Sequence, residues 1–151
     1  VEMLGTVRTL SESDEELIFK RISEIVTNTA EANGAHAIVE LPYSSHYPVT
    51  FNDIELTKNM VPSLQKAAGS DHVNLIPAET GAEDFSFFAN EVPGFYFYVG
   101  ALPKGQDPKT SASHHTPDFF LDESGFITGV KAMLNLVSDY METSSVAYSK
   151  K

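Results

Sequence analysis

The sequence feature that most constrains the fold is the stretch FYFYVG at residues 95–100, which is almost continuously apolar. A strand in a half-buried sheet alternates apolar and polar residues, whereas a strand that is apolar on both faces needs cover on both. The stretch therefore predicts a strand that is buried on both faces within a larger sheet.

Apolar residues at helical spacing predict a long helix near the start of the chain. Ser11 and Ser13 each precede a carboxylate by three residues, so either serine can open a capping box. The apolar stripe then runs through residues 17–30. Asn33 followed by Gly34 is a left-handed helix stop, so we expect the helix to end there.

Two further helices are expected on the same grounds. The first begins after the capping pair at 52–53 and closes at Gly69. Pro62 lies within it and costs about 3 kcal/mol inside a helix, so it predicts a kink or two short helices. The last helix is capped by Asp122 or Ser124, and its polar end is expected to fray.

Short β-prone segments at residues 4–10, 35–41 and 73–76 complete the expected elements. The order strand, helix, strand at the start is half of a βαββαβ sandwich, which has one sheet with helices on a single face. A lone half leaves the edges of that sheet bare. We therefore expect it to pair with a second copy of the chain or to exchange strands with it.

The charge of the chain limits its partners. It has 21 acidic and 10 basic side chains and a formal net charge of -11, which repels nucleic acid and anionic lipid. No apolar run approaches the roughly 20 residues that span a bilayer, and the chain has no Cys. No secretory signal is visible, so we expect a cytoplasmic protein. Because the chain begins with Val1 rather than Met, and residues 1–10 already read as a strand, we expect a piece cut or processed from a longer polypeptide.

Two stretches carry possible chemistry. Residues 113–122, SHHTPDFFLD, place His114 and His115 just before Pro117, which stiffens the loop. A neutral imidazole there can hold a divalent metal, or the stretch can be a capped turn with two solvated histidines. Residues 80–85, TGAEDF, suggest a tight turn that starts a short helix, with the carboxylates at its positive end.

Three stretches stand in a fixed order: GTVR at 5–8, TGAEDFSFF at 80–88, and FYFYVG followed by SHHTPDFF at 113–120. In motif, order and spacing they resemble the carboxy-terminal part of the aminoacylase-type metallopeptidase family, over about residues 4–141. The resemblance is to its amidohydrolase branch, which includes hippurate hydrolase, thermostable carboxypeptidase and indole-acetyl-amino-acid hydrolase.

The resemblance implies an α/β fold in two parts. Residues 1–50 match the second half of a βαββαβ lid and dimerisation domain, and residues 51–151 match the carboxy-terminal part of a zinc-peptidase-like α/β catalytic domain. The resemblance also implies hydrolysis of the amide bond of N-acyl amino acids or short peptides. It implies two divalent metal ions for this chemistry, zinc or else manganese or cobalt, and a homodimer.

The resemblance further implies roles for individual residues. His115 falls at the family's last metal ligand, and Arg8 falls where a lid arginine faces the substrate carboxylate. Gly81 and Glu83 match a turn that lines the substrate site, where Glu83 would support the metal-bound water or a ligand. The alternatives are a solvated histidine, a surface arginine and a helix-capping carboxylate.

The chain lacks most of the family's metal site. The remaining metal ligands and the general-base Glu of the family have no counterpart in these residues. One imidazole binds zinc poorly, because a stable site takes three or four ligands. We therefore expect this chain alone to hold no metal stably and to be inactive. The alternative hypothesis is a stand-alone, non-catalytic module that self-associates.

Overall fold

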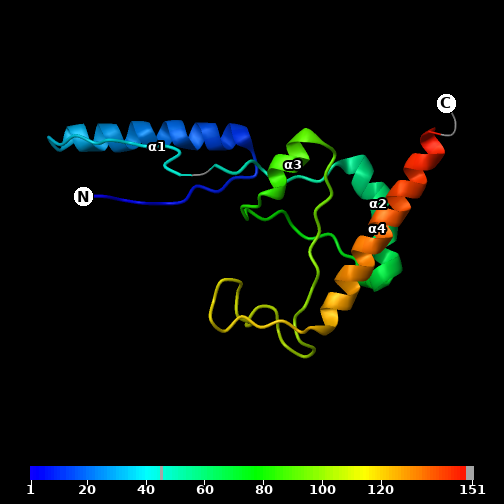
Figure 1. Cartoon of the computed structure of the whole chain (residues 1–151). Coiled ribbons are helices and arrows are strands. Elements are labelled where there is room, and N and C mark those ends of the chain that lie inside the picture. The colour runs from blue at the N-terminus through cyan, green and yellow to red at the C-terminus, as the bar shows by residue number, and fades with distance from the viewer. Residues whose placement is uncertain (45, 149–151) are drawn as a thin grey trace. The chain divides into compact units, whose positions relative to one another are not determined.

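The computed structural model describes residues 1–44 and 46–148, and its elements are helical (Figure 1). The chain divides into two compact units. Unit 1 holds Val1–Asn52 and Ile76–Gly94, and unit 2 holds Asp53–Leu75 together with the described residues from Phe95 onward. These compact units do not coincide with the lid and catalytic domains expected at 1–50 and 51–151. The two domains stay predictions. The elements in chain order are α1 (Glu12–Ala32), α2 (Ile54–Ala68), the 3-10 turn η1 (Ser70–His72), α3 (Phe85–Glu91) and α4 (Ser124–Tyr148).

Helix α1 begins and ends at the residues that its sequence signals predict. The Ser11 hydroxyl accepts a hydrogen bond from the backbone N–H of Asp14 at 3.3 Å, which caps the helix. Asn33 is the C-cap, and Gly34 follows in the left-handed region with φ of 70°. No side chain of α1 is buried, so the helix is set by its local signals rather than by a core.

Helix α2 is also bounded by its caps. The Asp53 carboxylate accepts from the backbone N–H of Leu56 at 2.7 Å, and Gly69 ends the helix with φ of 91°. Pro62 lies inside one continuous helix, so the alternative of two short helices was wrong. The last helix, α4, begins where the Asp122 carboxylate accepts from the Ser124 N–H at 2.9 Å. The expected end at 143–151 is helical as far as Tyr148, and residues 149–151 lie outside the described chain.

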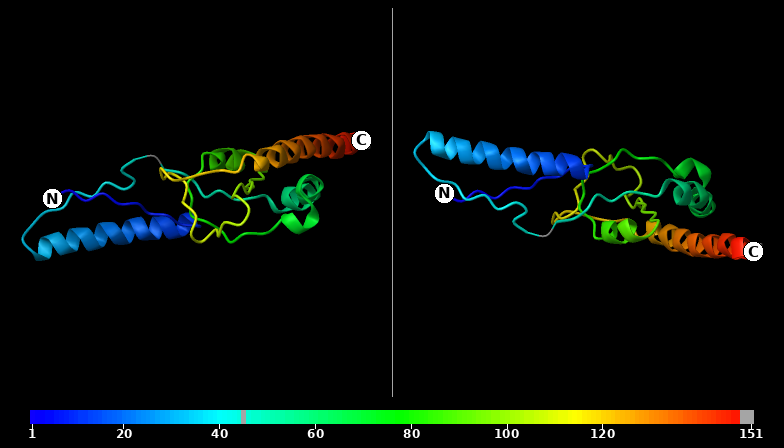
Figure 2. Two further views of the ribbon diagram at one scale, coloured as in Figure 1. Left: turned by 90° about the horizontal axis from the view of Figure 1, so that it is seen from below. Right: turned by 90° about the horizontal axis from the view of Figure 1, so that it is seen from above.

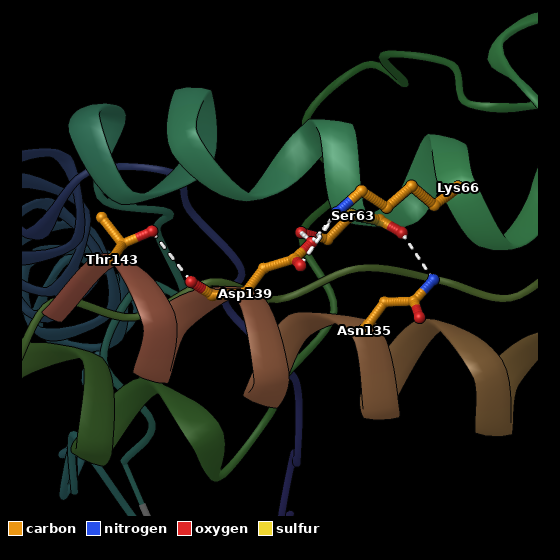
Figure 3. Close-up of polar contacts among 5 residues, drawn as sticks. All are labelled: Ser63, Lys66, Asn135, Asp139 and Thr143. Carbon is orange, nitrogen blue, oxygen red and sulfur yellow. Dashed lines mark hydrogen bonds and ion pairs between the residues drawn. The ribbon is translucent and has the colours of Figure 1, made fainter. Parts of the chain in front are cut away.

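Helices α2 and α4 pack together in unit 2 (Figure 1). Their contact buries Met60, Leu64 and Ala132, each less than a tenth exposed. A polar cluster of side chains also links the two helices (Figure 3). In it, the Ser63 hydroxyl donates to Asp139 Oδ2 at 2.5 Å, and Lys66 Nζ lies 2.8 Å from both oxygens of the same carboxylate.

The Asp139 carboxylate is the acceptor on which this cluster converges. The hydrogen bond from Lys66, and then that from Ser63, lowers the pKa of Asp139 below its ordinary value. The Asn135 amide donates to the backbone oxygen of Ser63 at 3.3 Å, and the Thr143 hydroxyl donates to that of Asp139 at 2.8 Å (Figure 3). The cluster therefore ties α2 to α4 through both side chains and backbone.

No strand forms within the described residues. The segments expected as strands, at 4–10, 35–41, 73–76 and 95–100, run as coil or bends, and Figure 2 draws them without arrows. A strand exists only beside a partner that satisfies its backbone groups, and these segments do not pair with one another. The sheet, and with it the α/β fold class, stays a prediction.

Much of the apolar surface of α4 is uncovered. Its exposed side chains border an apolar hollow of about 470 Å³ in unit 2. The hollow is lined by Val99, Phe126, Gly129, Val130, Met133 and Leu134. Phe126, Val130, Met133 and Leu134 are each more than half exposed.

None of the described helices is long and apolar enough to span a bilayer.

Candidate functional site

Unit 1 brings Arg8 to the turn that the sequence analysis singled out. Arg8 Nη1 donates a hydrogen bond to the backbone oxygen of Thr80 at 2.9 Å, although the two residues are 72 positions apart. Thr80 directly precedes Gly81 in the turn. A guanidinium carries five N–H donors, so this bond leaves further donors on an exposed side chain. The arrangement can present a forked cation beside the turn, as carboxylate binding requires.

The turn leads directly into α3. The backbone oxygen of Glu83 accepts two hydrogen bonds from Ser86, one from its hydroxyl at 2.6 Å and one from its N–H at 3.2 Å. Glu83 Oε1 also accepts from the backbone N–H of Phe85 at 3.4 Å. The Glu83 carboxylate thus lies at the start of the helix, which is the capping role left open by the sequence. Its role toward a substrate or a metal stays a prediction.

Glu83 and Asp84 form a pair of neighbouring carboxyl groups. Hydrogen bonding to the Glu83 carboxyl, followed by the nearness of its charge, raises the pKa of Asp84 above its ordinary value. Two carboxylates that share a hydrogen bond favour holding one proton between them, because both cannot ionise without repulsion. The pair can therefore hold a proton at Asp84, three residues after Gly81.

Gly81 has no steric requirement to be glycine in this structure. A Cβ built on its backbone meets no atom of the described residues within 4 Å, and its φ is not in the left-handed region. Gly94 is different, because a Cβ there would lie 3.0 Å from Ala89 Cβ and 3.1 Å from Phe85 Cε1. The close approach that only glycine allows is therefore at the end of α3 and not in the turn.

His115 lies in unit 2, on an exposed turn with a backbone φ of 64°. Few residues other than glycine adopt this conformation, and histidine is among those that do. The Thr116 hydroxyl donates to the backbone oxygen of Ser113 at 2.8 Å and holds the turn. The neighbouring His114 ring packs edge-on against Phe119, with ring centres 4.7 Å apart, so Phe119 anchors the loop from one side.

The residues that the structure describes offer an incomplete set of donors for a metal. Among the described residues there is no group of three or more His, Cys, Asp or Glu side chains that could hold a metal ion. His115 therefore offers one imidazole, and a stable zinc site takes three or four ligands. The residues described here do not fit a complete metal centre, and no chemical step can be assigned through a metal on their geometry.

Ser86 and Gly94 were not predicted from the sequence as residues that shape this turn. Ser63 and Ser86 are the largest fully buried side chains in the part of the chain that the structure describes, at 1% and 0% exposed. A serine three residues after a carbonyl at a helix start is spaced to bond back to that carbonyl. The spacing from Glu83 could be recognised in the sequence. The burial of Ser86, which makes the bond costly to lose, could not be predicted from the sequence.

Comparison with known proteins identifies relatives of the chain. Residues 3–139 match the model of the peptidase family M20/M25/M40. The chain is 28% identical over 138 residues to the putative amidohydrolase YhaA of Bacillus subtilis, a match that covers 91% of this chain and 34% of that protein. It is 30% identical over 137 residues to an N-acetyldiaminopimelate deacetylase of Lacticaseibacillus paracasei, with the same two coverages.

A plant protein is also similar. The IAA-amino acid hydrolase ILR1-like 6 of Arabidopsis thaliana is 25% identical over 139 residues, which are 91% of this chain and 30% of that protein. The chain thus spans about a third of the length of the curated relatives it matches. No solved structure matches the chain.

Proposed function

Because this chain belongs to the peptidase family M20/M25/M40, we propose that it is part of a metal-dependent amidohydrolase that cleaves the amide bond of N-acyl amino acids or short peptides. The observation that carries the proposal is the family match over residues 3–139. The names of two relatives support the substrate class, because N-acetyldiaminopimelate and an IAA-amino acid are both N-acyl amino acids. Such substrates carry a free carboxylate next to the scissile amide.

Arg8 is the residue that we propose binds this carboxylate. Its hydrogen bond to the Thr80 carbonyl at 2.9 Å supports the assignment, because it holds an exposed guanidinium beside the turn with Gly81 and Glu83. Gly81 would line the site through its backbone. Glu83 would support the metal-bound water or a ligand, and the neighbouring Asp84, whose pKa is raised, would hold a proton near the reacting amide.

His115 is the residue that we propose binds a metal. Two divalent ions, zinc or else manganese or cobalt, would polarise the scissile carbonyl and supply a hydroxide nucleophile when bound. The remaining ligands and the general-base Glu would come from residues outside this chain. We therefore propose that the 151 residues alone are inactive.

We also propose that the protein is a cytoplasmic homodimer that binds neither nucleic acid nor membranes. The net charge of -11 supports the exclusion of anionic partners. Leu17 and Ile25 on α1 are more than half exposed and support an interface in unit 1. The same exposed apolar residues favour the second candidate function, a non-catalytic module that self-associates.

The test is substrate binding by Arg8 in a family-length polypeptide that contains this chain. We expect Arg8→Ala to raise KM for an N-acyl amino acid by roughly 10- to 100-fold, because a hydrogen bond to a charged group contributes about 1.5–3 kcal/mol. The C-terminal amide of the same substrate lacks the carboxylate, so its KM should change little.

The control is Arg21→Ala, because Arg21 is an exposed arginine on α1 that pairs with Glu24. Its KM should match that of the unsubstituted protein. A protein that cleaves no N-acyl amino acid or short peptide with zinc, manganese or cobalt present would refute the proposed function. Measurable hydrolysis by the 151 residues alone would refute the proposal that they are inactive.

A further inference from the structure

Ser86 makes a buried polar contact in unit 1. Its side chain is 0% exposed, and its hydroxyl donates to the backbone oxygen of Glu83 at 2.6 Å. A fully buried hydroxyl cannot exchange this bond for one to water. Removing the hydroxyl would leave the Glu83 carbonyl with only the bond from the Ser86 N–H among those described here. Ser86 therefore fixes the direction of the Glu83 peptide group.

The turn is held at both ends. Arg8 donates to the Thr80 carbonyl at one end, and Ser86 donates to the Glu83 carbonyl at the other. Asp84 is the N-cap of α3 but makes no side-chain capping bond. The Asp84 carboxyl pairs with Glu83 instead, and Ser86 steadies the same end of the helix by donating to the Glu83 carbonyl.

The packing of α3 keeps Ser86 in place. Ala89, on the next turn of the same helix, is 4% exposed. Gly94 approaches Ala89 so closely that an added Cβ would lie 3.0 Å from the Ala89 Cβ. Since no side chain stands between them, α3 is fixed against the chain that follows it, and Ser86 cannot shift without moving that contact.

We infer that Ser86 is a positioning residue, whose buried hydroxyl holds the Glu83–Asp84 carboxyl pair in place relative to Arg8. This inference rests on the proposed function for its consequence in catalysis. Ser86 would not touch the substrate itself, because its side chain is fully buried. Its effect would reach the reaction through the Glu83 peptide group and the carboxyl pair that follows.

The first test needs no activity and uses the 151-residue chain. The carboxyl carbons of Glu83 and Asp84 are followed by NMR through a pH titration, in the unsubstituted chain, in Ser86→Ala and in Ser63→Ala. In the unsubstituted chain Asp84 should titrate above its ordinary value. In Ser86→Ala its titration should fall back toward that value. Ser63→Ala removes a serine hydroxyl in unit 2 that is equally buried, and it should move the titration of Asp139 instead.

An Asp84 titration that stays the same in Ser86→Ala, or moves equally in Ser63→Ala, would overturn the inference. If Ser86→Ala unfolds the chain, Ser86→Cys carries the same test, because a thiol fills the site but donates weakly. The second test measures kinetics in the family-length protein. Ser86→Ala should lower kcat/KM by roughly 10- to 100-fold and shift the acidic limb of the pH profile, as loss of supporting hydrogen bonds does elsewhere.

The two tests separate the inference from the proposed function. If the unsubstituted protein hydrolyses no N-acyl amino acid, the proposed function fails, but the titration still decides whether Ser86 positions the pair. If the titration responds but neither kcat/KM nor its pH profile changes, Ser86 holds the carboxyl pair without affecting the reaction. That result overturns its role as a positioning residue in catalysis.

Discussion

Replacing Gly94 with alanine should destabilise unit 1. The added Cβ would lie 3.0 Å from Ala89 Cβ and 3.2 Å from Ala89 Cα. Neither of these atoms can rotate away, because one belongs to the helix backbone and the other is bonded to it. The third neighbour, Phe85 Cε1 at 3.1 Å, belongs to a ring that can turn. The clash therefore has to be relieved by moving α3.

The size of the effect follows from two opposing contributions. Inserting an extra carbon into a packed contact costs about 1–3 kcal/mol. Replacing glycine with alanine also restricts the unfolded chain, which stabilises the fold by about 0.4–1 kcal/mol. The net loss should therefore be on the order of 1–2 kcal/mol. With a urea dependence of about 1–3 kcal/mol per molar, the urea midpoint for unit 1 should fall by roughly 0.3–2 M.

Amide hydrogen exchange of α3 is the appropriate assay, because two compact units need not unfold together. Gly81→Ala is the matched control, since its Cβ meets no described atom within 4 Å and it lies in the same unit. We expect faster exchange in α3 for Gly94→Ala and unchanged or slower exchange for Gly81→Ala. Equal exchange in the two variants would refute the argument that the close approach at Gly94 holds α3.

Two further predictions concern unit 2. The pKa of Asp139 is lowered by Lys66 and then Ser63, so its contribution to stability is present above the ordinary value of 3.8 and is lost as the pH falls through the lower folded value. The melting temperature of the unsubstituted chain should therefore fall more steeply below pH 3.8 than that of Asp139→Asn. Parallel plots of melting temperature against pH for the two proteins would contradict this. In the family-length protein, His115→Ala should lower the metal content and abolish turnover, whereas the control His114→Ala should do neither. If atomic emission shows an unchanged metal stoichiometry in His115→Ala, His115 is not a ligand.

The helices could be predicted because their signals are local. Ser11 caps α1 by bonding to an N–H three residues away, and Asp53 does the same for α2. Gly34 and Gly69 supply the positive φ with which these helices end. Pro62 was the exception, since a single helix accommodates it where two short helices were an alternative.

The candidate site was predictable only in part. Motif and order selected Arg8, Gly81, Glu83 and His115 in the sequence. The strands expected around them could not be judged from local signals, because a strand depends on partners that are distant in the sequence or absent from it. Glu83 had two roles open to it, and the structure supports the capping one through its bond to the Phe85 N–H.

The sequence by itself determined where α1, α2, α3 and α4 begin, and which residues carry the family motifs. Only the tertiary structure brought Arg8 against Thr80 across 72 positions, and only it buried Ser86 beside the close contact of Gly94 with Ala89. The physical reason is the range of the interactions. Caps and helical periodicity act over three or four residues, whereas burial and close approach depend on which distant segments pack together.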